Sequence, residues 1–87
     1  MRKVLMFTMA SCPYCQRAQR YMRELFEKKP EYKDIELTIV DENRQPEIAN
    51  QYDYYFVPTF YVDNVKVHEG AASPEDVAYV FKTAYGE

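Results

Sequence analysis

The first forty residues contain the pattern that most restricts the fold of this chain. Residues 3–9, KVLMFTM, form a nearly continuous apolar run, which is typical of a strand buried on both faces. Over residues 13–29 the apolar side chains recur every three or four positions, which predicts a helix. Residues 34–41 alternate apolar and polar side chains and predict a second strand, with Ile35, Leu37 and Ile39 on one face. A strand, a helix and a strand in this order predict a right-handed parallel crossover.

The second half of the chain predicts a short helix, a hairpin and a closing helix. Residues 46–52 predict the short helix, and two β-branched and aromatic runs at 59–62 and 65–68 flank the turn residues Asp63 and Asn64. Ser73 is a favoured N-cap residue and Pro74 follows at the first helical position, so a closing helix is predicted to begin here. The predicted order is β-α-β-α-β-β-α, an α/β fold with a mixed four-stranded sheet and helices on both faces.

Length, composition and charge limit the function classes. A chain of 87 residues with 47% hydrophobic and 29% charged residues predicts one folded domain, residues 1–87. Its net charge of −3 is spread among interleaved charges, so we expect no nucleic-acid partner. The N-terminal apolar run of about six residues is far shorter than the ~20 of a membrane span. We therefore expect a cytoplasmic, monomeric protein without membrane association.

The only two cysteines, Cys12 and Cys15, form a C-x-x-C pair. Two cysteines are too few for the disulfide framework of a small secreted domain, so redox or metal chemistry is favoured. Zinc normally takes four ligands and the only histidine is His68, so a zinc site would have to be shared across a dimer. Two packed cysteines without chemistry are the remaining alternative. We expect no resident metal.

The position of the pair favours thiol–disulfide exchange. If the helix begins at Pro13, Cys12 lies at its N-terminus, where free backbone N–H groups and the helix dipole stabilise a thiolate. Cys15 follows almost one helical turn later, close enough to attack a mixed disulfide formed at Cys12. Between them, Pro13 fixes the backbone and Tyr14 presents an aromatic surface to a substrate. We predict Cys12 as the attacking thiolate and Cys15 as the resolving thiol.

The whole chain resembles the thioredoxin superfamily, and CPYC at residues 12–15 is the dithiol motif of glutaredoxins. The resemblance implies a three-layer thioredoxin-like fold and an electron carrier that reduces disulfide-containing proteins or mixed disulfides. It also implies that Pro58 is a cis-proline facing the dithiol, with the Val57 backbone pairing with an extended peptide or glutathione. The alternative is a trans proline that begins an edge strand.

Several positions depart from the glutaredoxin pattern. Met9 stands where a basic residue commonly serves glutathione, and Gly70-Ala71 replaces the usual Gly-Gly, although GAAS at 70–73 is similar to the thioredoxin stretch. Met6 stands where thioredoxins carry a buried acid, so Cys15 is expected to lose its proton to water or substrate. Arg17 and Arg20 are the remaining candidate cations for glutathione, and the alternative is that both are solvated surface charges of the helix. Either glutathione or a thioredoxin reductase therefore remains as reductant, and no permanently bound cofactor is expected.

Two other functions remain open. The first is an iron–sulfur cluster held by Cys12 thiolates of a dimer together with glutathione. The second is a catalytically idle interaction domain whose aromatic loop (Tyr52, Tyr54, Tyr55 and Phe56) binds a partner. This loop is equally compatible with core packing, whereas His68, inside a predicted strand, is expected to be a surface or packed residue rather than a catalyst.

Overall fold

The central strand of the sheet is the N-terminal apolar run. In the computed structural model, which describes all 87 residues, β1 (Val4–Thr8) pairs in parallel with β2 (Leu37–Asp41) and antiparallel with β3 (Thr59–Val62). β4 (Val65–Glu69) pairs antiparallel with β3, which gives the strand order β2-β1-β3-β4. The predicted mixed four-stranded sheet is confirmed, and the parallel β1–β2 pair results from the predicted crossover through the first helix.

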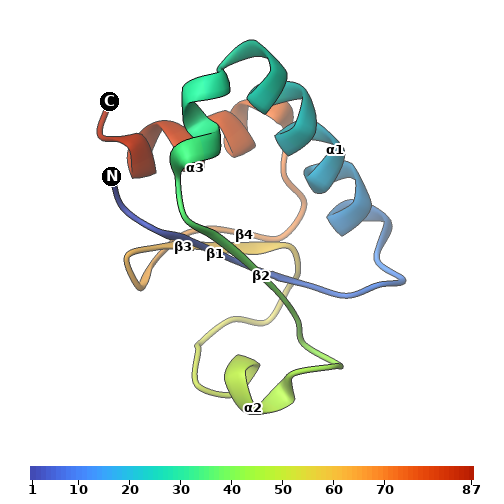
Figure 1. Ribbon diagram of the computed structural model, residues 1–87. Helices are drawn as coiled ribbons and strands as arrows, with labels where there is room; N and C mark the ends of the chain where they lie inside the picture. The colour runs from blue at the N-terminus through green and yellow to red at the C-terminus, as the bar shows by residue number, and fades with distance from the viewer.

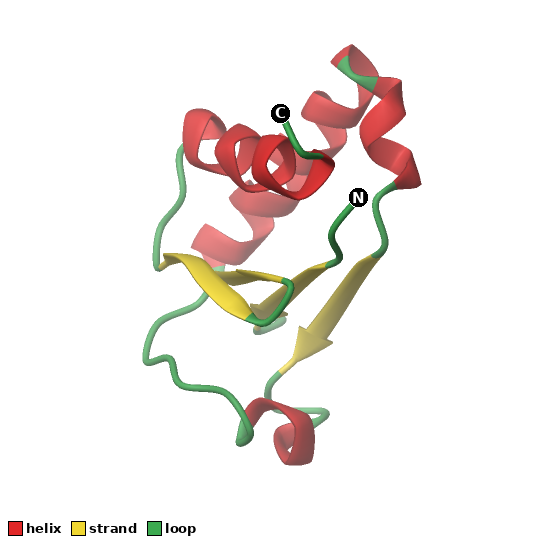
Figure 2. Cartoon of the chain, turned by 90° about the vertical axis from the view of Figure 1, so that its left-hand side faces the viewer, coloured by secondary structure: helices red, strands yellow, loops and turns green.

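Helices cover both faces of this sheet. α1 (Pro13–Lys28) and α3 (Pro74–Tyr85) lie together on one face, and α2 (Pro46–Ala49) lies on the other (Figures 1 and 2). The element order β-α-β-α-β-β-α is therefore confirmed, although α2 ends three residues before the predicted boundary. None of the helices combines the length and apolarity that a membrane span requires.

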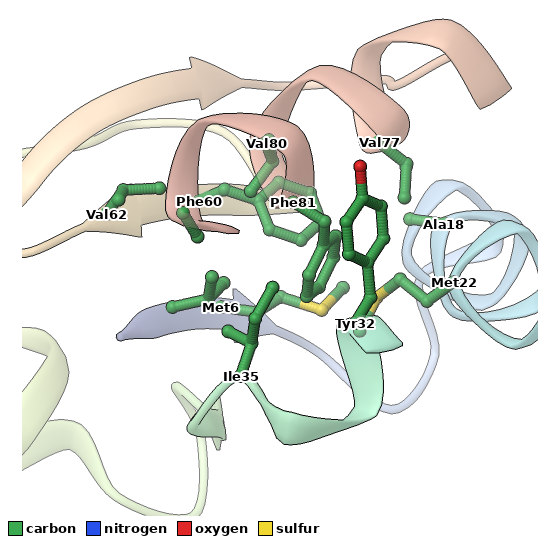
Figure 3. Packing of buried hydrophobic residues seen from close by; sticks show 12 residues of the cluster. Met6, Ala18, Met22, Tyr32, Ile35, Phe60, Val62, Val77, Val80 and Phe81 are labelled. Carbon is green, nitrogen blue, oxygen red and sulfur yellow. The ribbon is translucent and has the colours of Figure 1, made fainter. Parts of the chain in front are cut away.

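Each face of the sheet buries its own apolar cluster. The larger cluster lies under α1 and α3, and Figure 3 shows Met6 and Phe60 of the sheet converging there with Met22 of α1 and Phe81 of α3. The smaller cluster, on the α2 face, joins Phe7, Val40, Ala49 and Tyr61. Because β1 supplies Val4 and Met6 to the first cluster and Phe7 to the second, its apolar run is nearly continuous rather than alternating.

The segment between α1 and β2 differs from the prediction. Residues Pro30–Asp34 form a 3₁₀ helix, η1, and β2 begins only at Leu37. Pro30 occupies the first position of η1, and this turn carries Tyr32 and Ile35 into the larger cluster. Ile35 is therefore a core residue outside the sheet, and Ile39 is 41% exposed because β2 is an edge strand. The prediction that Ile35 shares a strand face with Leu37 and Ile39 is wrong, whereas Leu37 and Ile39 do lie in the strand.

Local signals at the hairpin and at the last helix are confirmed. Asp63 and Asn64 adopt the positive φ angles of 47° and 67° that a two-residue hairpin turn requires. At α3 the Ser73 Oγ accepts a hydrogen bond from the Asp76 amide, and the Asp76 carboxylate accepts one from the Ser73 amide, each at 3.0 Å. This reciprocal capping box satisfies two backbone donors that the first turn of a helix would otherwise leave without partners.

The capping box predicts a defined loss of stability. Ser73→Ala should lower the free energy of unfolding by about 1 kcal/mol because the Asp76 amide loses its acceptor. Ser73→Thr keeps a hydroxyl acceptor and should lie within a few tenths of a kcal/mol of the parent, on the order of ordinary surface substitutions. Urea unfolding followed by circular dichroism measures both. Equal stability of the alanine variant and the parent would show that the cap contributes nothing.

Candidate functional site

The turn between β1 and α1 places the first cysteine at the start of a helix. Cys12 is the N-cap of α1, with extended backbone angles, and Pro13 is the first helical residue, as predicted. The Cys12 amide donates to the Met9 carbonyl at 3.2 Å, which closes the turn. The Cys15 amide donates to the Cys12 Sγ, also at 3.2 Å. The sulfur of Cys12 therefore accepts a hydrogen bond from one of the free N–H groups at the positive end of α1.

The two thiols, both free, have different surroundings. Cys12 retains 7% of its surface, whereas Cys15 retains 1%. Burial, and secondarily the hydrogen bond with Cys12, raises the pKa of the Cys15 thiol to about 11. Cys15 is therefore protonated at neutral pH, and Cys12 is the sulfur that an external disulfide can reach.

A segment distant in sequence lies against Cys12. The Val57–Pro58 peptide bond is cis, as the resemblance implied, and Pro58 is buried. The Cys12 thiol lies 3.8 Å from the Val57 carbonyl oxygen, within range of a weak S–H···O hydrogen bond. The fold therefore brings Val57 and Pro58 to the reactive sulfur.

Gly70 joins the site through Pro58, and Ala71 follows it in the same turn. The Gly70 amide donates to the Pro58 carbonyl at 2.8 Å, and Gly70 has a φ of +91°, which disfavours any residue with a side chain. The His68 Nε2 lies 3.2 Å from the Gly70 carbonyl and 3.1 Å from that of Ala71, so the imidazole carries its proton on Nε2 and donates to this turn. His68 is therefore a half-buried residue whose side chain stabilises this turn.

Tyr14 and the arginines of α1 lie at the surface. The Arg17 guanidinium stands 4.8 Å from the centre of the exposed Tyr14 ring, and that of Arg20 lies 5.3 Å from the Tyr21 ring. Arg17 is thus a cation beside the dithiol motif, whereas Arg20 is associated with a ring about two turns further along the helix. Met9 is half-buried.

A polar cavity adjoins Cys15. It has a volume of about 340 Å³, and its lining includes Thr8, Arg23 and Asp41 besides Cys15. Met6, two residues before Thr8 on the same face of β1, is fully buried in the larger apolar cluster, so β1 contributes no acid beneath the dithiol. The cavity gives the buried thiol polar neighbours.

The aromatic segment divides between core and surface. Tyr52 and Tyr54 pack on Phe7 in the smaller cluster, with ring centres 5.0 and 4.7 Å from that ring. Tyr55 and Phe56 are 86% and 67% exposed just before Val57. Core packing is therefore confirmed for Tyr52 and Tyr54, whereas partner binding by the exposed Tyr55 and Phe56 stays a prediction.

One residue of the site had no signal in the sequence. The Glu69 Oε2 accepts hydrogen bonds from the Tyr55 amide at 2.6 Å and the Phe56 amide at 3.0 Å, and its Oε1 lies 2.7 Å from the Lys66 Nζ. These donors, Lys66 first, lower the pKa of Glu69 from 4.5 to about 2. Nothing in the residue pattern joins Glu69 to a loop 13 and 14 positions earlier.

Comparisons with known proteins agree with this geometry. The sequence model of the thioredoxin domain family matches residues 2–82. A thioredoxin of Methanocaldococcus jannaschii is 30% identical over 80 residues, which cover 92% of each chain. The fold is similar to that of mitochondrial thioredoxin 3 of Saccharomyces cerevisiae in its oxidised form, with a TM-score of 0.73 and 22% identity over 94% of this chain and 77% of the yeast chain.

A malarial protein of known structure matches at a TM-score of 0.74 and 20% identity over 97% of both chains. At such identities the two structures show the fold alone. The relatives with a family name are thioredoxins, so the glutaredoxin subtype that CPYC indicates stays a prediction. The fold and the two neighbouring cysteines support thiol–disulfide oxidoreductase activity in general. On this sequence match and this fold, the chain belongs to the thioredoxin domain family.

Proposed function

We propose that this protein is a dithiol electron carrier that reduces disulfides of other proteins through Cys12 and Cys15. One observation carries the proposal: the Cys12 sulfur caps α1, accepts the Cys15 amide and lies 3.8 Å from the carbonyl oxygen before the cis-proline. A sulfur at the positive end of a helix is stabilised as a thiolate, which is the nucleophile of disulfide exchange.

In the first step the Cys12 thiolate attacks one sulfur of the substrate disulfide. A Cys12–substrate disulfide forms, the substrate S–S bond breaks, and the departing substrate thiolate takes a proton from solvent. Pro13, Tyr14, Val57, Pro58, Gly70 and Ala71 are proposed to form the substrate surface, since they surround or support the Cys12 sulfur. The exposed ring of Tyr14 offers apolar area beside the reacting atoms.

In the second step the Cys15 thiolate attacks the Cys12 sulfur. The mixed disulfide breaks, the second substrate thiolate leaves and takes a proton, and a Cys12–Cys15 disulfide remains, so that two electrons have passed to the substrate. The hydrogen bond and charge of Cys12 help to raise the pKa of Cys15, and both contributions end when Cys12 enters the mixed disulfide. The pKa of Cys15 is therefore lower in the mixed disulfide, which is the state in which Cys15 attacks. We propose that the polar groups of the adjacent cavity pass its proton to water.

For recycling, we infer a thioredoxin reductase rather than glutathione. Glutathione is anionic and is held best by charge-assisted hydrogen bonds, but Met9 supplies no cation beside the motif. Lys66, which contacts the loop before the cis-proline, is already paired with Glu69. Arg17 remains as a cation beside Tyr14 and is the residue on which glutathione recycling would depend. A chain with only two cysteines lacks the disulfide framework of a small secreted domain, which fits a reducing compartment such as the cytoplasm.

Cysteine substitutions test the chemistry. Cys12→Ser should abolish reduction of a protein disulfide because the attacking thiolate is lost, while serine, a favoured N-cap, preserves the start of α1. Cys15→Ser should instead accumulate a mixed disulfide at Cys12, visible by mass spectrometry without reductant. Circular dichroism checks that both variants are folded. Turnover by Cys12→Ser at the parent rate would refute the proposed function.

The reductant is tested by two coupled assays on the oxidised protein. NADPH with thioredoxin reductase should reduce it at least about tenfold faster than glutathione with glutathione reductase, since one missing hydrogen bond to a charged group costs about 1.5–3 kcal/mol. Met9→Lys should speed the glutathione route and Met9→Leu, the matched control, should not. A faster glutathione route in the parent, reduced by Arg17→Ala but not by Arg20→Ala, would reverse the assignment.

A further inference from the structure

Side chains of the sheet hold both ends of the loop before the cis-proline, residues 53–57. At its first residue, the Asp53 carbonyl accepts hydrogen bonds from the Tyr61 hydroxyl at 2.6 Å and the Lys66 Nζ at 3.2 Å. Near its end, the Glu69 carboxylate accepts the amides of Tyr55 and Phe56 at 2.6 and 3.0 Å. Lys66 and Glu69, joined at 2.7 Å, therefore connect the two attachments, and we call this pair the β4 clamp.

A bulge in β4 makes the clamp possible. Residues three apart on a regular strand point to opposite faces, so Lys66 and Glu69 would not meet. In this sheet Tyr61 pairs with Lys66 but Phe60 pairs with His68, so that Val67 is an extra residue and the register shifts. The shift returns Glu69 to the face that carries Lys66 and Tyr61. Bulges often re-aim a side chain next to an active site in this way.

The clamped loop carries an unusual surface. Tyr55 and Phe56 are 86% and 67% exposed, although neighbouring Tyr54 is packed in the core. Val57 follows at once and its carbonyl oxygen lies 3.8 Å from the Cys12 sulfur. The backbone of two large, exposed aromatic residues is thus held one and two positions before the residue whose carbonyl oxygen lies beside the Cys12 sulfur. Fixing such side chains beforehand lowers the entropy lost when a partner docks on them.

We propose that Glu69 is a positioning residue that holds the Tyr55–Phe56 loop ready to dock protein disulfides, and so determines the preference for protein over small-molecule disulfides. This inference rests on the proposed dithiol exchange and deepens it. The ligand is a protein segment that carries a disulfide flanked by apolar side chains, which contact the two aromatic rings while the disulfide meets Cys12. A small disulfide touches Cys12 without reaching the loop, so its reaction does not use the clamp.

The ionised state of the clamp makes a separate prediction about stability in acid. Glu69, faced by Lys66 and near Asp53 and Tyr61, has a pKa lowered from 4.5 to about 2 by Lys66 and the two loop amides. A lowered pKa stabilises the folded protein above pH 4.5, and this contribution disappears as the pH falls toward 2. The difference in unfolding free energy between the parent and Glu69→Gln should therefore shrink over that interval. Urea unfolding at a series of pH values measures it, and a constant difference would contradict an ionised clamp.

The proposal itself is tested by rapid mixing of the reduced protein with two substrates, insulin as the protein disulfide and 2-hydroxyethyl disulfide as the small one. Glu69→Gln loses the ion pair with Lys66, and its remaining carbonyl oxygen is an uncharged and therefore weaker acceptor for the two loop amides. It should lower the rate constant with insulin about tenfold and change that with the small disulfide less than about twofold. Lys66→Gln, which leaves Glu69 on the loop amides, should have a smaller effect in the same direction.

Ser73→Ala is the matched control, since it destabilises α3 without touching the loop, and both of its rate constants should equal those of the parent. An equal fall of both rate constants in Glu69→Gln would make the clamp merely structural and overturn the proposal, as would no change with insulin. If the unaltered protein reduces neither substrate, the dithiol function fails, an outcome distinct from failure of the clamp.

Discussion

The structure depends on one hydrogen bond at the start of α1, from the Cys15 amide to the Cys12 sulfur. It satisfies a backbone donor that the first turn would otherwise leave free, and it thereby makes the reactive sulfur part of the helix cap. Pro13 strengthens the arrangement because its missing N–H is not needed at the first helical position. The same contact therefore begins the helix and positions the Cys12 sulfur.

The position of this contact is well defined because β1, which leads into the turn, is buried on both faces. Its residues supply both apolar clusters, with Met6 and Phe7 fully buried on opposite faces, and they end directly before the turn that carries Cys12. The methionine at position 6 leaves the dithiol without a buried acid on β1, so we propose that Cys15 passes its proton to water or to substrate. The cavity beside Cys15 supplies polar neighbours, among them Thr8, Arg23 and Asp41.

The fold could be predicted from the sequence wherever the interactions that determine it are local. The apolar run of β1, the helical period of α1, the Asp63-Asn64 turn and the Ser73 cap each act over a few residues, and all were predictable. η1 was not, because Ile35 continues the alternation of β2 in sequence but leaves the sheet to fill the larger cluster. Such a choice depends on the space between α1, α3 and the sheet, which no short pattern reports.

The same distinction applies to the site. CPYC and its helix start were sufficient to predict that Cys12 lies at the start of α1 with Cys15 almost one turn later, because both cysteines lie within one turn of chain. The surroundings that select a partner were not predictable, since Glu69 reaches Tyr55 and Phe56 only through a bulge whose register shift has no signature in the alternation of β4. Two chains with an identical dithiol motif can therefore share a reaction and differ in partner, because the reaction is determined within α1 and the docking surface by contacts between β4 and a distant loop.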